Sequence, residues 1–184
     1  MTRIVAVSGS RSADSTTRAA LRVALDAAAD AGAETDLIDL AAVDLPLYHP
    51  DEDAQGDSEA LKRRVREADG VLAGTPVYRG SYSSTFKNFH DFCGSDEYAD
   101  TAVGLLATAG GGSYGGTLEH LRSTFRNVHA WTVPHEVGIQ GASSKVETAA
   151  AAPDRGPRIT DEDLRRRTER LGRVVVEHAE RMRE

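Results

Sequence analysis

Cysteine and lysine are both scarce in this chain of 184 residues. The single cysteine, Cys93, permits no internal disulfide and fits a reducing compartment. Of the 22 basic residues only Lys62, Lys87 and Lys145 are lysines, and 29 acidic residues bring the net charge to −7. A negative net charge argues against a general nucleic-acid binder or a membrane-surface binder.

Long hydrophobic runs are also missing. No stretch approaches the ~20 consecutive apolar residues of a membrane-spanning helix, and the N-terminus leads directly into a strand pattern. We therefore expect a cytoplasmic protein without membrane contact. Cys93 follows Phe92 on the apolar face of a predicted helix, which favours a small core residue over a nucleophile. His49 has no partner at metal-ligand spacing, so the sequence assigns no metal site, and it requires no acid–base residue.

Short apolar runs alternate with helical patterns along the whole chain, whose length predicts one domain over residues 1–184. Strands are predicted at 3–7, 35–40, 71–73, 101–108 and 127–133, the last stopped by Pro134. This alternation predicts an α/β fold, a doubly wound three-layer sandwich with right-handed crossovers. Five strands favour a parallel sheet of order 2-1-3-4-5 over a six-stranded dinucleotide fold.

Helical periodicity places the other elements. A helix with Leu21, Leu25 and Ala28 on one face is expected to end at Gly32. A second helix is predicted from Ser58 to Ala68, ending at Gly70, and an exposed loop over 141–157. The last helix begins near Thr160, and its apolar stripe is predicted to contain Leu164, Leu171, Val174, Val175 and Met182.

The loop after the first predicted strand, residues 8–18, is rich in serine and threonine and leads into a helix. Hydroxyl groups, backbone N–H groups and the positive end of the helix would all point at one place, as in a phosphate site. The alternative is that Ser15 or Thr16 only caps the helix. Capping needs one such residue and this loop supplies six, so we favour the phosphate site.

The stretch after the third predicted strand, residues 74–89, contains a proline, two tyrosines, two glycines and several hydroxyl residues. Pro76 cannot donate into a central ladder, so the strand is expected to end there. Ser83 or Ser84 can cap the following helix. Such a junction suits a flat, partly aromatic ligand that carries an anionic group, although an ordinary turn would also explain it.

The loop after the fourth predicted strand contains a run of glycines that formally matches G-x-G-x-x-G, and Glu136 lies about 20 residues further on. We reject a dinucleotide fingerprint because that motif belongs to the first strand of its unit, where this chain has a hydroxyl-rich loop. Bare glycine backbone would instead let a flat ring approach closely. A wide, flexible turn without a ligand is the remaining alternative.

Strands 1, 3 and 4 are neighbours in the predicted order, so the three loops should meet at the carboxyl edge of the sheet. With these loops in place, the sequence resembles the NADPH-dependent FMN reductase family of flavodoxin-like proteins. The residues that carry the resemblance are Gly9-Ser10, 15–18, 74–83, Lys87-Asn88, 110–112 and 114–116.

The resemblance implies a set of FMN-binding residues in each loop. The phosphate would be held by Ser10, Ser12, Ser15, Thr16 and Thr17, with Arg11 as the alternative to Ser12. The isoalloxazine ring would be lined by Pro76, Val77, Tyr78, Arg79, Gly80 and Ser81, and closed at its other edge by Thr108, Gly110 and Gly111. The family often has histidine where this chain has Arg79. That arginine would stabilise charge on the ring, bind the phosphate of NADPH, or simply be solvated.

The implied activity is an FMN-dependent NAD(P)H oxidoreductase. Hydride would pass from NADPH or NADH through FMN to a quinone, flavin, azo or metal acceptor in a ping-pong cycle. A flavodoxin-like electron carrier and a non-catalytic nucleotide- or phosphate-binding regulatory module are the alternatives. The resemblance also implies a homodimer or homotetramer, with the loop 45–57 and the helix 86–93 available for contact.

Overall fold

The computed structural model describes residues 1–151, 154 and 156–183. Its main sheet is parallel and has the strand order β2-β1-β3-β4-β5, so the predicted fold and strand order are confirmed. The strands are β1 (Arg3–Ser8), β2 (Glu34–Asp39), β3 (Gly70–Pro76), β4 (Ala102–Ala109) and β5 (Trp131–Gln140).

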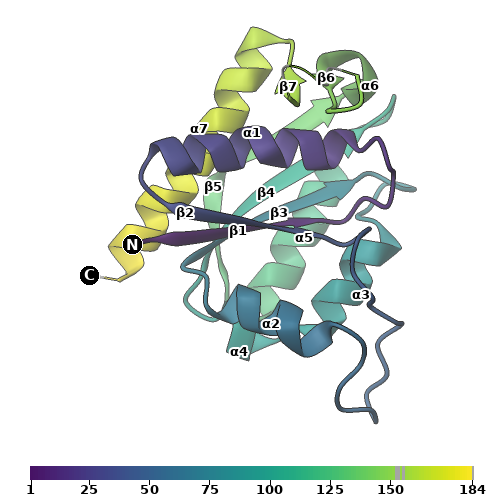
Figure 1. Ribbon diagram of the computed structural model, residues 1–184, viewed down its shortest axis with the longest axis vertical. Helices are drawn as coiled ribbons and strands as arrows, with labels where there is room; N and C mark the ends of the chain where they lie inside the picture. Colours follow the sequence, from purple (N-terminus) through teal and green to yellow (C-terminus); the bar gives the residue numbers. More distant parts are fainter. Residues whose placement is uncertain (152–153, 155, 184) are drawn as a thin grey trace.

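Helices cover both faces of this sheet (Figure 1). One face carries α1 (Thr16–Asp30) and α7 (Glu162–Met182), and the other carries α2 (Ser58–Arg66), α3 (Ser84–Phe92), α4 (Ser95–Tyr98) and α5 (Gly115–Asn127). Each face has its own apolar core. Ile4 and Ala6 of β1 point into the first, whereas Val5 and Val7 point into the second. Because β1, β3 and β4 are buried on both faces, they read as nearly continuous apolar runs.

The predicted end of the fifth strand is wrong. Asn127 is the last residue of α5, and β5 continues through Pro134 as far as Gln140. Between the paired positions Val103–Thr132 and Leu105–Glu136, β5 contains two more residues than β4. Pro134 therefore lies in a bulge on an edge strand, where its missing N–H interrupts no regular ladder.

Two other boundaries differ from prediction. Helix α2 ends at Arg66, and Gly70 is the first residue of β3 rather than a helix terminator. A Cβ at Gly70 would lie 2.8 Å from side-chain atoms of both Ile4 and Val175, so close packing explains this glycine. Met182 does not belong to the buried stripe of α7, because it is 37% exposed at the C-terminal end of the helix.

Residues 141–157 are not simply an exposed loop. They include a short helix α6 (Ala142–Lys145) and strand β6 (Val146–Glu147), which pairs antiparallel with β7 (Arg158–Ile159). Ala142, Val146 and Thr148 are buried, because α6, β6 and β7 pack over the end of the α1 layer (Figure 1). Residues 152, 153 and 155 of this stretch lie outside the described part of the chain. Within that part, no helix is long and apolar enough to cross a membrane.

Candidate cofactor site

Hydrogen bonds join the three loops at the carboxyl edge of the sheet. The N–H of Gly9 donates to the carbonyl of Gly74 (2.8 Å), and the N–H of Val77 donates to the carbonyl of Thr108 (2.8 Å). The hydroxyl of Ser83 donates to the carbonyl of Gly9 (2.6 Å). The first loop is thereby tied to the second, and the second to the third. The structure thus brings the sequence-predicted site residues to one edge.

Two hydroxyl groups of the first loop form hydrogen bonds within the protein. The Ser15 hydroxyl caps α1 by accepting the N–H of Arg18 (3.1 Å), which is the capping role considered as the alternative. The buried Thr17 hydroxyl lies 2.5 Å from the hydroxyl of Thr108, so it links the first loop to the end of β4. Ser15 and Thr17 therefore shape the loop, whichever ligand occupies it.

Other groups of this loop remain available to a ligand. The Thr16 hydroxyl is half-buried, the Ser12 side chain is exposed, and neither hydroxyl bonds to any described residue. The buried Ser10 hydroxyl accepts the N–H of Ser12 at 3.3 Å. Together with the first N–H groups of α1, these hydroxyls form a cluster of donors suited to a phosphate.

Sequence reasoning missed the part that Arg18 has in this loop. Its guanidinium pairs with Asp39 of β2 at 2.9 Å and donates to the carbonyl of Ala13 at 2.6 Å. Arg11 instead lines a cavity of about 170 Å³, together with Leu40, Leu45, Leu47, Ser84, Thr85 and Asn88.

The second loop forms a tight two-residue turn. Tyr78 and Ser81 exchange both backbone hydrogen bonds, at 2.9 and 3.1 Å, around Arg79 and Gly80. Pro76 is buried as the last residue of β3, Val77 is half-buried, and Tyr78, Arg79 and Gly80 are exposed. The Ser81 hydroxyl lies 3.0 Å from Nδ1 of His120 on α5, a contact that sequence spacing could not reveal.

The third loop has its carbonyl groups engaged and its N–H groups free. The Gly110 carbonyl accepts the N–H of Gly141 (2.7 Å), and the Gly111 carbonyl accepts Nε2 of Gln140 (3.0 Å). The N–H groups of Gly110 and Gly111 donate to no described residue. Free donors in bare backbone at this edge can approach the rim of a flat ring.

The glycines of the chain differ in what requires them. A Cβ at Gly9 would lie 2.7 Å from Cβ of Phe86, and a Cβ at Gly138 would collide with the ring of Tyr114. Packing inside the protein explains those two positions. A Cβ at Gly110, Gly111 or Gly112 would meet nothing within 4 Å, and none of the three has φ in the left-handed region. Neither packing nor backbone conformation therefore requires glycine at 110–112.

The groups with the most perturbed pKa values lie outside these loops. Burial raises the pKa of the Cys93 thiol to about 12, which fits the predicted core role. Burial also raises the pKa of Tyr98 and lowers that of His90, whose ring packs against Tyr98 and Phe125. His90 and Cys93 border a cleft of about 770 Å³ between the C-terminal halves of α3 and α5, remote from the three loops.

The fold defines a flavodoxin-like protein, and its candidate site lies at the carboxyl edge of the sheet. The FerB flavoenzyme NAD(P)H:(acceptor) oxidoreductase from Paracoccus denitrificans superposes with a TM-score of 0.79 at 22% identity, over 98% of each chain. The apo form of the NADH:FMN oxidoreductase EMOB superposes with a TM-score of 0.75 at 22% identity, over 95% of this chain and 88% of that one. At this level of sequence identity, the two superpositions show that the fold is shared.

The chain belongs to the NADPH-dependent FMN reductase family, whose model matches residues 2–144. An NADPH azoreductase from Bacillus sp. (strain OY1-2) is 37% identical over 132 residues, 70% of this chain and 72% of the relative. The NADH-dependent FMN reductase SfnE from Pseudomonas putida is 38% identical over 100 residues, 51% of this chain and 53% of the relative. The predicted family, the oxidoreductase class, FMN and the nicotinamide co-substrate are confirmed.

Proposed function

We propose that residues 1–184 act as one cytoplasmic domain that binds FMN in the three loops and oxidises NAD(P)H. The observation that carries this assignment is the glycine run 110–112, which packing and backbone conformation leave unexplained. An isoalloxazine ring against this run would account for it, since any side chain there would occupy the space of the ring.

The arrangement of donors supports one orientation of FMN. The hydroxyls of Ser10, Ser12, Ser15 and Thr16 and the N-terminus of α1 would bind its phosphate. The hydrogen bonds of Ser15, Thr17 and Arg18 within the protein hold the loop in shape. The ring would then extend toward the turn 78–81 and the glycine run. Free N–H groups at Gly110 and Gly111 would bond to the ring edge where negative charge develops.

When bound, FMN accepts a hydride from NAD(P)H and passes two electrons to an acceptor. A ping-pong cycle follows from a site in which one open ring face must serve both substrates in turn. The acceptor class we propose is a quinone, flavin, azo compound or metal ion. Two of the relatives, one named azoreductase and one named FMN reductase, support the azo and flavin members of this range.

Two measurements test the assignment. The purified protein should bind FMN at a 1:1 ratio with a flavin absorption spectrum, and recovery of FAD alone would contradict the phosphate site. With FMN bound, it should oxidise NADPH or NADH steadily while a quinone is present. A single burst without turnover would indicate an electron carrier, and no oxidation would indicate a non-catalytic module.

We also propose a homo-oligomer, most simply a C2 dimer. In the helix 86–93, Phe86, Phe89 and Cys93 are buried in the core of their own subunit, so only its outer side would be available for contact. The loop 45–57 offers an apolar contact surface, since Leu47 is 84% and Tyr48 44% exposed. Leu47→Asp should shift the sedimentation coefficient toward the monomer. A wild-type protein that is active as a monomer at micromolar concentration would exclude this assembly.

A further inference from the structure

The turn 78–81 contains a backbone conformation that its sequence does not favour. Arg79 has φ of +53° and Gly80 has φ of +80°. Positive φ at both central residues is typical of a type I′ turn, where Asn or Asp followed by Gly is preferred. Arginine has no short polar side chain that could stabilise the left-handed backbone conformation, so the backbone at Arg79 is strained. Asp100 and His129 also have positive φ, but Arg79 is the one of the three that lies at the candidate site, and strained residues cluster at active sites and ligand clamps.

The backbone of this turn is nevertheless firmly held. Besides the two hydrogen bonds between Tyr78 and Ser81, the Ser81 hydroxyl contacts His120 of α5 at 3.0 Å. The carbonyl oxygen of Gly80 lies 3.6 Å from where a Cβ of Gly116 would be, so the turn also lies against the start of α5. The main chain of Arg79 is thus fixed at the rim of the site.

The side chain of Arg79 is a free cation in an acidic protein. It is exposed and forms no ion pair with any carboxylate in the part of the chain that the structure describes. Some arginines of the chain are neutralised, such as Arg18 by Asp39 at 2.9 Å and Arg64 by Asp36 at 2.7 Å, whereas Arg79 is not. A cation held at the rim, with no internal partner, is available to an anionic group that arrives with a substrate.

We propose that Arg79 binds the 2′-phosphate of NADPH and so makes NADPH the preferred donor of this protein. This inference rests on the proposed function. The nicotinamide must reach the flavin ring, and the 2′-phosphate lies on the adenosine half, at the opposite end of the co-substrate. An exposed rim position suits that end better than the ring itself. The monoester carries nearly two negative charges and accepts the paired donors of a guanidinium.

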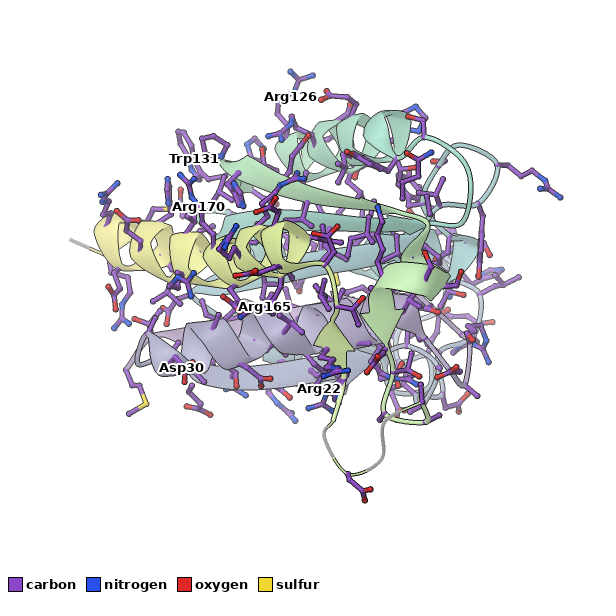
Figure 2. All side chains as sticks on the ribbon, turned by 90° about the horizontal axis from the view of Figure 1, so that it is seen from above. Arg22, Asp30, Arg126, Trp131, Arg165 and Arg170 are labelled. Carbon is purple, nitrogen blue, oxygen red and sulfur yellow. The ribbon has the colours of Figure 1, made fainter. Side chains whose placement is uncertain are left out.

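The chain offers a matched pair of substitutions. Asparagine tolerates positive φ, so Arg79→Asn removes the charge and relieves the strain together. Arg126→Asn is the control, because Arg126 is exposed, has no ion-pair partner among the described residues, and lies at the far end of α5 near Trp131 (Figure 2). Both variants change the net charge equally, so a general electrostatic effect would appear in both.

The decisive measurement is the ratio of kcat/KM for NADPH to kcat/KM for NADH in the FMN-loaded protein. Arg79→Asn should lower this ratio by about tenfold to a hundredfold, the range expected for one charge-assisted contact at a partly exposed site. Calorimetric titration with adenosine 2′,5′-bisphosphate should show weaker binding to Arg79→Asn, whereas binding of 5′-AMP should change little. The thermal midpoint should stay equal or rise, and Arg126→Asn should leave the donor ratio unchanged.

Three results would overturn the inference. An equal loss with both donors would place Arg79 at the shared diphosphate or in a structural role. A lower flavin reduction potential with an unchanged donor ratio would place it at the ring. An unchanged ratio and an unchanged potential would make it a solvated side chain. If the wild-type protein oxidises neither donor, the proposed function itself fails, and that result differs from all three.

Discussion

Gly111→Val separates the fit of the cofactor from the stability of the protein. In the structure a Cβ at this position would have no neighbour within 4 Å, and φ lies outside the left-handed region. The added Cβ therefore meets no atom of the protein, and the backbone is not in the left-handed region that disfavours a side chain. The free energy of unfolding of the FMN-free protein should change by less than about 0.5 kcal/mol, or rise by up to about 1 kcal/mol as the unfolded chain loses freedom.

The affinity for FMN should respond quite differently. If the ring lies on the glycine run, the branched side chain occupies part of its volume, and the ring must shift or the loop must move. Overpacking of this kind costs about 1–3 kcal/mol, which corresponds to roughly a 5- to 150-fold weaker Kd. Titration of the FMN-free protein, followed by quenching of flavin fluorescence, measures this change directly.

Gly94→Val supplies the control. A Cβ at Gly94 would also meet no atom within 4 Å, and its φ is −125°, but this glycine lies between α3 and α4, away from the three loops. The substitution should leave the Kd for FMN unchanged. If Gly111→Val binds FMN as tightly as the wild type, the glycine run does not contact the ring, and the main support for the proposed function is lost.

Thr16→Ala should weaken FMN binding without changing stability, because the Thr16 hydroxyl has no partner among the described residues. Ser15→Ala should lower the free energy of unfolding by about 0.5–2 kcal/mol, because α1 loses its N-cap. Urea unfolding and FMN titration of both variants test this contrast, and equal stability losses would contradict it. The Cys93 thiol, with its pKa raised to about 12, should react with iodoacetamide at pH 8 only after unfolding; rapid labelling of the folded protein would be inconsistent with its burial. Burial lowers the pKa of His90 below its ordinary value of 6.5. As the pH falls below that value, the unfolded chain therefore binds a proton at His90 more readily than the folded protein does. The free energy of unfolding is therefore not reduced by His90 above about pH 6.5, and it falls as the pH drops below that value. His90→Phe should lose less stability than the wild type between pH 8 and pH 5, and parallel losses in urea unfolding would show that His90 does not titrate in this way.

Local sequence patterns predicted the elements whose environment is uniform. The strands at 3–7 and 101–108 are buried on both faces, so an apolar run identifies them without knowledge of their neighbours. Their alternation with helices then restricts the sheet to few orders, and the observed order is the predicted one. The bounds of the edge strand β5 escaped this reasoning, because proline is excluded only from regular ladders and the bulge at Pro134 depends on the pairing with β4.

The composition of the loops likewise indicated where the candidate site lies, but not which contacts each residue makes there. Ser15 and Ser12 look alike in sequence; only the fold commits the first to capping α1 and leaves the second exposed. His120 contacts Ser81 across 39 positions of the chain, a distance that no local pattern spans. The sequence by itself determined the layers, the strand order and the loops of the site. The tertiary structure decided which glycines serve packing and which leave space for a ligand, because that distinction depends on atoms brought together from remote segments.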